Sequence, residues 1–477
     1  MRKTESLSRN YIYSLSYQVL ALVVPLLTTP YVTRILGPSG LGDYAYTSAT
    51  VSYFGIVAAL GTATYAQRET AVCQNSETDR TVVFWEILLL RLFMTALVGA
   101  AYLLFLFTAK EYRVLYGIQL CTVLSWAFDI SWFFQGMENF RVTVIRNCVV
   151  KLAGLILVFL LVRQKEDLWL YALILCGTVL LGNVTMWPFL RGYLGKRPSA
   201  GLKPFRHLKG SLVLFVSAVS VQIYTVLDQT MLGQMVNNTQ VGYYSQAVKI
   251  IHIGSSILAS LTSVFLPRVA ALWAEKKREE AEKYFEKAIF FGWMLNLPMT
   301  VGLIMTAEYL VPLFLGNQFL PSISILRILS LIFVTQGMGQ IAGTLLVALK
   351  RQKEYTIAVT AGAAMNLCCN LFLIRLWSAD GAAAASVAAE ICVEFLMFRY
   401  LSADMGIGVL KRGFLNYLLP TAGMGCVVFL TSCFLPVTWV SLIALILLGC
   451  GCYGGILLLK RDAFLMGLVQ GRIRKWK

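Results

Sequence analysis

Charged residues, Glu86 among them, interrupt stretches of the sequence that are otherwise apolar, and seven of these charged residues are candidates for a functional role. The basic ones are Arg34, Arg91, Lys151, Lys249 and Arg327, and the acidic ones are Asp129 and Asp228. Ionisable groups are costly in hydrocarbon, so they usually face a water-filled cavity or a bundle interior. A cavity gathering the five basic side chains would be strongly positive in a low-dielectric setting, which favours an anionic cargo such as a phosphate head group. We interpret these five as candidate substrate-binding residues, although snorkelling or a structural ion pair is the alternative for each alone.

The two acidic residues are candidates for ion coupling or for structural ion pairs. Asp228 lies in the stretch 211–235, and Lys249 lies at a similar depth in the antiparallel stretch 243–267. Each stretch carries further polar residues at helical spacing. One interpretation is a hydrated cavity wall, and the other is a seam of small residues in which Asp228 pairs with Lys249. Both interpretations stay open. The accompanying residues are Ser217, Ser220 and Tyr224 in the first stretch, and Ser245, His252, Ser256, Ser260 and Ser263 in the second.

The elements that must position these residues are membrane-spanning helices. Of the 477 residues, 58% are hydrophobic and 14% are charged, whereas a soluble domain carries about 25% charged residues. The apolar stretches run about 20 residues, which is the length of a spanning helix and not of a barrel strand. The sequence therefore predicts an all-α polytopic membrane protein with about fourteen transmembrane helices. We place them near 11–35, 44–66, 82–108, 112–134, 142–162, 168–190, 211–235, 243–267, 287–306, 322–348, 355–375, 381–401, 414–434 and 438–459.

The distribution of Lys and Arg predicts the orientation. With the N-terminus inside, the even-numbered connections carry most basic residues, whereas the connections near 235–243, 306–322 and 434–438 carry none. The positive-inside bias therefore predicts that both termini are cytoplasmic. It also explains the net charge of +17, so no nucleic-acid partner is needed. The first apolar stretch is too long for a cleavable signal peptide and reads as a retained first span.

A weak internal repeat predicts the domain organisation. Segment 20–72 aligns with segment 220–272 at a constant offset of 200, with identities such as Tyr44 with Tyr244 and Arg68 with Arg268. Six spans separate the copies, so both cross the membrane in the same direction, as in parallel-repeat transporters. We predict an N-terminal six-helix lobe at 1–200 and a C-terminal six-helix lobe at 201–402. Residues 403–477 form transmembrane helices 13 and 14 and a basic cytoplasmic tail.

No motif for catalysis or for a bound cofactor is present. The eleven cysteines include no CxxC, and His207 and His252 are the only histidines, so neither a metal site nor a disulfide framework is expected. The sequence has no Gly-rich phosphate loop, no HExxH and no nucleophile elbow. We therefore expect a protein that is not an enzyme and that holds no cofactor.

Several segments resemble bacterial polysaccharide-repeat-unit (Wzx-like) flippases. NYIYSLSYQVLALVVPLLTTPYVTRILGPSGLGDYAYTSA at 10–49 resembles their opening, and FFQGMENFRVTVIRNCVVKLAGLILVFLLV at 133–162 resembles their fourth-to-fifth span junction. IYTVLDQTMLGQ, VGYYSQAVKI and FLPRVAAL, between 223 and 272, resemble the start of their second lobe. MNLCCNLFLI and GAAAASVAAEI, within 365–391, resemble their spans eleven and twelve. The resemblance covers nearly the whole chain in the right order.

This resemblance implies the fold of the multidrug/oligosaccharidyl-lipid/polysaccharide exporter superfamily, with two six-helix lobes plus two helices. It implies a bacterial inner-membrane protein that carries an undecaprenyl-pyrophosphate-linked oligosaccharide to the outer leaflet by alternating access, for surface polysaccharides such as O-antigen or capsule. Coupling would be to a proton or sodium gradient, and polysaccharide polymerase machinery would be a partner. Of the five basic residues, Arg34, Lys151 and Lys249 lie within the matched segments, and Arg91 and Arg327 do not.

Three other functions stay open. A cation-coupled multidrug exporter of the same superfamily would be expected to line its cavity with acidic residues. A flippase for a peptidoglycan precursor would share the basic cavity. A scaffold for a glycan polymerase would use the buried charges structurally, and loss of transport in a normally folded Lys249→Ala variant would contradict that role.

Overall fold

The protein is built from helices. The computed structural model describes residues 7–196, 201–262, 266–402, 405–406, 408–462 and 464–466, with side chains from Gln18 onward apart from gaps within 213–225 and 257–267. In these ranges the only strand-like feature is an isolated bridge between Arg191 and Leu194. The predicted all-α membrane fold is confirmed.

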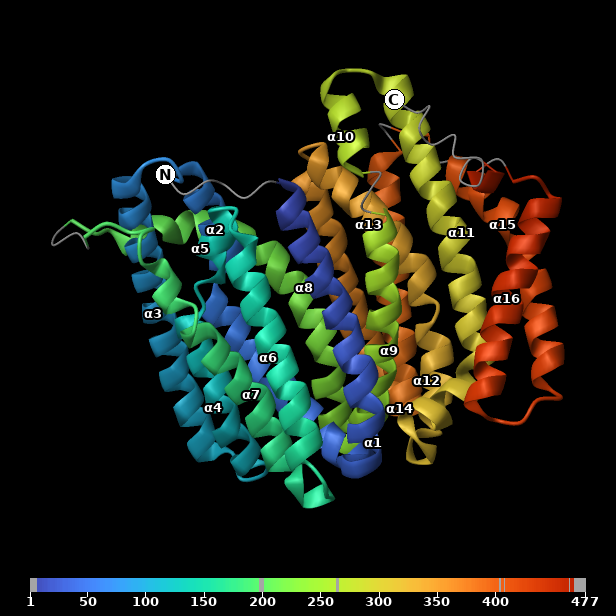
Figure 1. Ribbon diagram of the computed structural model, residues 1–477, viewed down its shortest axis with the longest axis horizontal. Coiled ribbons are helices and arrows are strands. Elements are labelled where there is room, and N and C mark those ends of the chain that lie inside the picture. Colours follow the sequence, from blue (N-terminus) through green and yellow to red (C-terminus); the bar gives the residue numbers. More distant parts are fainter. Residues whose placement is uncertain are drawn as a thin grey trace. The chain divides into compact units, whose positions relative to one another are not determined.

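The helices fall into two compact units, residues 1–233 and residues 234–477. Within the first, α4 packs against α7 and α1 against α6 (Figure 1). Its helices are α1 (Leu7–Ala59), α2 (Thr62–Val72), α3 (Glu77–Thr108), α4 (Arg113–Phe128), α5 (Ser131–Gly136), α6 (Phe140–Leu161), α7 (Leu168–Val184) and α8 (Leu208–Met235), of which α8 ends just beyond the unit. Those of the second are α9 (Asn238–Thr262), α10 (Leu266–Ala274), α11 (Arg278–Leu310), α12 (Ser322–Leu329), α13 (Ile332–Ala348), α14 (Gln352–Leu401), α15 (Gly408–Ser432) and α16 (Trp439–Leu459).

Ten helical segments within the described ranges are long and apolar enough to cross a membrane. Two helices, α1 with 53 residues and α14 with 50, are more than twice the length of one crossing. Each contains one break, so each can cross twice. The helices α8 and α9 have 28 and 25 residues, which is also enough for a crossing. These helix lengths are compatible with fourteen crossings, and that number stays a prediction.

The breaks in α1 and α14 each involve one non-helical residue, whereas the predicted spans leave loops at 36–43 and 376–380. In α1 only Gly37 leaves helical geometry, with φ 67° and Pro38 next to it. Glycine adopts this left-handed backbone without the steric cost of a Cβ, and proline suits the first turn of the helix that follows. In α14 the break is Ser378, with φ 50°. Predicting loops here was wrong because each helix is interrupted at a single residue in this conformation.

The two copies of the internal repeat show the same order of elements. In the first copy, α1 breaks at Gly37, continues to Ala59 and is followed by the short α2. In the second copy, α8 ends at Met235, α9 runs to Thr262 and the short α10 follows. The break at position 37 and the α8–α9 connection are thus 200 residues apart. The three-part division at 200 and 402 rests on this repeat and stays a prediction.

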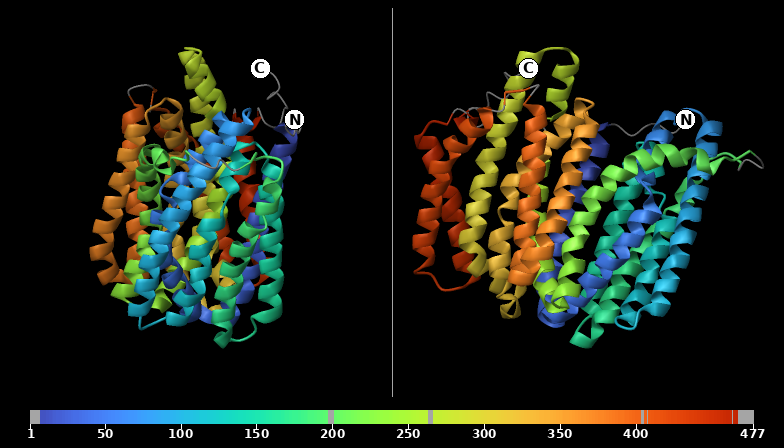
Figure 2. Two further views of the ribbon diagram at one scale, coloured as in Figure 1. Left: turned by 90° about the vertical axis from the view of Figure 1, so that its left-hand side faces the viewer. Right: turned by 180° about the vertical axis from the view of Figure 1, so that it is seen from behind.

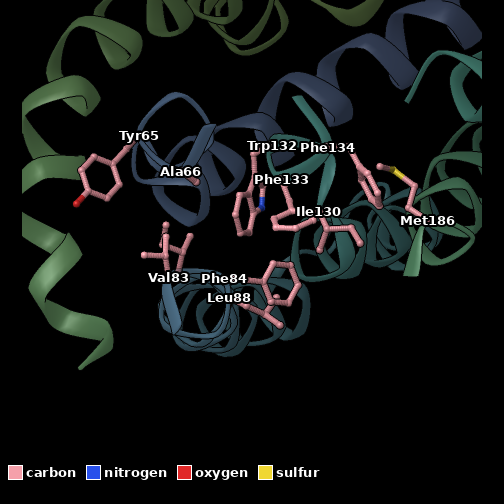
Figure 3. Close-up of a cluster of buried hydrophobic side chains, with 11 residues drawn as sticks. Tyr65, Ala66, Val83, Phe84, Leu88, Ile130, Trp132, Phe133, Phe134 and Met186 are labelled. Carbon is pink, nitrogen blue, oxygen red and sulfur yellow. The ribbon is translucent and has the colours of Figure 1, made fainter. Parts of the chain in front are cut away.

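The first unit has an aromatic core where α2, α3 and α5 meet (Figure 3). Phe84 stacks on Trp132 with ring centroids 5.5 Å apart and meets Phe133 edge-on at 5.1 Å. Gly136 on α5 permits a close approach to α2, because a Cβ at this position would lie only 2.6 Å from the carbonyl oxygen of Gln67. This core holds the short α5 in place directly after Asp129.

In the second unit, α11 packs against α15, and α15 against α16 (Figure 2). Pro298 lies inside α11 and has no N–H, so the carbonyl of Met294 loses its helical partner. The hydroxyl of Tyr453 on α16 donates to that oxygen at 2.8 Å. A side chain of the last helix therefore satisfies the polar group that the proline leaves.

Candidate functional site

Arg91 and Asp129 come together inside the first unit. The Arg91 guanidinium on α3 lies 3.4 Å from the Asp129 carboxylate and donates to the carbonyl oxygen of Trp126 at 3.2 Å. Its side chain is 6% exposed, and that of Asp129 is 26% exposed. Asp129 ends α4, and its carboxylate also accepts from the backbone N–H of Ser131 at 2.9 Å. The pair thus joins α3 to the junction between α4 and α5.

A second guanidinium extends this polar cluster. Arg146 on α6 donates to the amide oxygen of Asn183 on α7 at 2.9 Å, and the Asn183 amide donates to the carbonyl oxygen of Ser125 at 2.8 Å. Sequence reasoning missed Arg146 and Asn183 as interior groups. Arg146 lies near the start of the predicted span 142–162, where a basic residue is typical of the adjoining cytoplasmic connection.

Arg327 also has an acidic partner. On α12, its guanidinium donates to the Glu308 carboxylate at 2.8 Å and to the carbonyl oxygen of Ile304 at 3.2 Å. The Arg327 side chain is 39% exposed and that of Glu308 is 62% exposed. Exposed ion pairs of this kind contribute little to stability. Arg327 therefore lies at the edge of the second unit and not within a buried cluster.

Arg34 and Lys151 belong to the first unit, on different helices. Arg34 is an exposed residue near the break in α1, and its guanidinium donates to the carbonyl oxygen of Pro30 at 2.5 Å. Lys151 lies midway along α6 and is half-buried, with Cys148 as an electrostatic neighbour.

Lys249 and Asp228 fall in different units. Lys249 on α9 is half-buried and donates to the Gln246 side chain at 3.2 Å. Asp228 on α8 is 3% exposed and lies near the hydroxyl of Tyr53, which is hydrogen-bonded to Thr230 at 2.7 Å. Pairing with Lys249 and a shared cavity wall both stay predictions. Of the accompanying polar residues, the side chains of Ser217, Ser220, Tyr224, Ser260 and Ser263 lie outside the described ones.

One buried charge with several partners is a residue that the sequence analysis did not select. Glu86 on α3 is 1% exposed. Its carboxylate is 2.6 Å from the Arg206 guanidinium and 2.9 Å from the His207 ring, and it accepts from the backbone N–H of Lys203 at 2.7 Å. The other nitrogen of the His207 ring is 3.0 Å from the hydroxyl of Tyr65. A lone glutamate inside an apolar stretch was the signal that could have found this cluster.

We expect Glu86→Ala to lower the free energy of unfolding by about 2–3 kcal/mol, which is the usual contribution of hydrogen bonds to a charged group. The variant also leaves the buried His207 ring without its carboxylate partner. Thermal unfolding in detergent would measure this. Glu69→Ala is the matched control, since Glu69 forms an ion pair with its exposed neighbour Arg68. Equal losses for the two variants would contradict the structural role of Glu86.

The second unit contains buried amides that sequence reasoning also missed. Asn366 and Asn370 are fully buried on α14, and the Asn370 amide donates to Asn366 at 3.0 Å. On the other half of α14, the Ser386 hydroxyl lies 2.9 Å from that of Tyr244 on α9. The i, i+4 spacing of two asparagines in an apolar helix was the available signal. Among the residues that were searched, no three His, Cys, Asp or Glu side chains gather to hold a metal ion.

The chain is similar to two protein families and to several curated proteins. The profile of the family described as polysaccharide biosynthesis protein matches residues 7–273, and the MatE profile matches residues 214–372. A putative O-antigen transporter of Escherichia coli strain K12 is 22% identical over 83% of this chain and 97% of its own length. The probable low-salt glycan biosynthesis flippase Agl15 of Haloferax volcanii is 23% identical over 40% of this chain and 41% of its own.

A solved structure shares the fold. The lipid II flippase MurJ in an inward closed conformation is similar with a TM-score of 0.74, at 17% identity, over 96% of this chain and 99% of that one. At this level of identity the likeness concerns the fold alone. It extends across both compact units and the last two helices.

Proposed function

Because the chain belongs to the polysaccharide biosynthesis protein family, whose profile covers more than half of its residues, we propose that it moves a lipid-linked oligosaccharide across the membrane. The direction is from the inner to the outer leaflet of a bacterial cytoplasmic membrane, with both chain ends cytoplasmic. The cargo is an undecaprenyl-diphosphate-linked repeat unit of a surface polysaccharide. The full-length similarity to a putative O-antigen transporter is the observation that carries the proposal.

The chemistry of the interior supports an anionic cargo. Arg34, Lys151 and Lys249 all lie within the family match. Lys249 is half-buried, and its ammonium donates to the neutral side-chain amide of Gln246 on its own helix. Ammonium and guanidinium groups held away from bulk water bind phosphate oxygens by charge-assisted hydrogen bonds. Arg91 and Arg327, which contact carboxylates, are weaker candidates for the same task.

Transport by alternating access requires an energy source. We propose coupling to a proton or sodium gradient, with Asp228 as the acidic candidate because it is almost fully buried in a spanning helix. Asp129 is better explained as the partner of Arg91. Polysaccharide polymerase machinery would receive the translocated cargo. The protein itself would make and break no covalent bond.

Reconstitution in proteoliposomes tests the function. We expect wild-type protein to expose a fluorescent lipid-diphosphate-linked oligosaccharide to an external glycosidase faster than protein-free vesicles do. A peptidoglycan precursor and a fluorescent organic cation, loaded in parallel vesicles, represent the two alternative cargoes. Movement of the cation without movement of the oligosaccharide would favour a drug exporter. Movement of the peptidoglycan precursor alone would favour that flippase class instead.

A further inference from the structure

Two buried polar groups on one face of α3 lack a hydrogen-bond partner. Arg91 and Thr95 lie one turn apart, so their side chains project from the same side of the helix. Both residues are buried, with 5% and 6% of their surface exposed. Neither the Arg91 Nη1 atom nor the Thr95 hydroxyl has a partner within the described ranges of the chain. Because buried polar atoms nearly always have a partner, these two atoms point to a ligand.

The Thr95 hydroxyl differs from those of other threonines in the long helices. Thr28, Thr50 and Thr178 each donate to the carbonyl oxygen four residues earlier. That is the usual bond of a threonine inside a helix. Thr95 does not form it in the structure, although the carbonyl in question belongs to Arg91. Its hydroxyl proton is therefore available to a group outside the helix.

The surroundings of Arg91 carry an excess of positive charge. Asp129 is the acidic partner of Arg91, at 3.4 Å, and it also lies within electrostatic range of Arg146 on α6. The hydrogen-bond acceptor of Arg146 is the neutral amide of Asn183. In the contacts that the structure describes here, two guanidinium groups are thus set against one carboxylate. A water molecule would satisfy the free donors, but only an anion would also offset the remaining buried charge.

We propose that the first unit binds a small monovalent anion of the halide class, such as chloride, between the Arg91 guanidinium and the Thr95 hydroxyl. The Nη2 atom of Arg91 already contacts Asp129 and the carbonyl oxygen of Trp126. Arg91 therefore cannot offer both terminal nitrogens to a phosphate or carboxylate, as the usual bidentate contact requires. A single spherical ion needs no such pair of donors, and its one negative charge balances the excess.

The protein also leaves room along this face of α3. One turn beyond Thr95, a Cβ built on Gly99 would meet no heavy atom within 4 Å. The proposed ion is a resident of the first unit and is separate from the lipid-linked cargo. It stabilises the part of the unit where α3 contacts the end of α4, because it supplies the acceptor that Arg91 lacks.

Thermal unfolding of the full-length protein in detergent tests the site. The measurement replaces sodium gluconate stepwise by sodium chloride at constant ionic strength. A ligand that binds only the folded protein raises the unfolding temperature as its concentration increases. We therefore expect a rise that saturates with chloride concentration and that sodium bromide reproduces.

Two substitutions remove the free donors and keep the charge. Thr95→Val replaces the hydroxyl by a methyl group of similar size, and Arg91→Lys keeps a cation beside Asp129 but removes Nη1. We expect each to weaken the apparent affinity for chloride about tenfold or more, because a hydrogen bond to a charged group is lost. Thr306→Val is the matched control and should keep the wild-type response. Thr306 is 7% exposed, and its hydroxyl donates to the carbonyl oxygen of Gly302 in its own helix.

Bromide also locates the ion. Crystals of the full-length protein soaked in sodium bromide should show an anomalous difference peak beside Arg91 and Thr95, and the peak should be weaker in Thr95→Val. Sodium phosphate, which stabilises folded proteins in general, should raise the unfolding temperatures of wild type and Thr95→Val equally. A larger gain for the wild type would mean that the site takes an oxyanion, and would overturn the halide assignment.

Two further results would overturn the proposal. One is an unfolding temperature of the wild type that does not depend on chloride, which would leave water as the partner of Arg91. The other is the same chloride response in wild type, Thr95→Val and Arg91→Lys, which would show that chloride acts elsewhere on the protein. None of these measurements involves transport, so failure here is distinguishable from failure of the proposed function.

Discussion

Replacing Lys249 by alanine is expected to slow translocation of a lipid-diphosphate-linked oligosaccharide about tenfold or more, because a hydrogen bond to a charged group contributes about 1.5–3 kcal/mol. Lys249 is half-buried on a spanning helix, with Gln246 as its hydrogen-bond acceptor. Its ammonium can exchange that neutral acceptor for a phosphate oxygen at little cost. The rate of oligosaccharide exposure in proteoliposomes measures the effect.

Three further variants serve as comparisons for Lys249→Ala. Lys249→Arg keeps the charge and should retain most of the activity, and Gln246→Ala should leave the ammonium available. Lys353→Ala removes an exposed charge at the start of α14 and serves as the matched control. Unfolding temperatures in detergent show that each variant is folded. If folded Lys249→Ala translocates the oligosaccharide at the wild-type rate, Lys249 does not bind the cargo.

Removing the Asp129 carboxylate is expected to destabilise the protein by about 3–5 kcal/mol, the usual cost of leaving a buried charge without its partner. The Asp129→Ala variant strands the Arg91 guanidinium, whose side chain is 6% exposed. One nitrogen of that guanidinium is buried and has no hydrogen-bond partner among the residues that the structure describes. Chemical denaturation in detergent, followed by tryptophan fluorescence, measures the loss.

A second substitution separates the charge effect from loss of packing. Adding Arg91→Leu to Asp129→Ala removes the stranded charge, so the double variant should be more stable than Asp129→Ala alone. Glu308→Ala is the control, since it opens the exposed pair with Arg327 and should change stability little. A double variant that is no more stable than Asp129→Ala would show that Arg91 does not carry the cost.

The positions of the charged residues along the chain could be predicted, but their partners could not. Arg91 and Asp129 were both selected because they interrupt apolar stretches. Their contact depends on how α3 packs beside the junction of α4 and α5, and 38 residues separate them. Glu86 was recognised as interior, yet its partners come from Arg206 and His207, in a segment that reads as a basic connection. Helical periodicity specifies a face of one helix and not which neighbour covers it.

The sequence by itself determined the class of this protein and, through the resemblance of its segments, the family. The class follows from local composition and from the length that a bilayer requires, and α6 and α16 begin and end within two residues of the predicted spans. Only the tertiary structure decided that the break in α1 is the single residue Gly37 and that Glu86 holds the connecting segment. It also decided that α8 belongs to the first compact unit. A repeat in the sequence indicates only the order of the helices. Whether a helix belongs to a compact unit depends on close packing between residues far apart in the chain, such as that of Gly61 against Ser211.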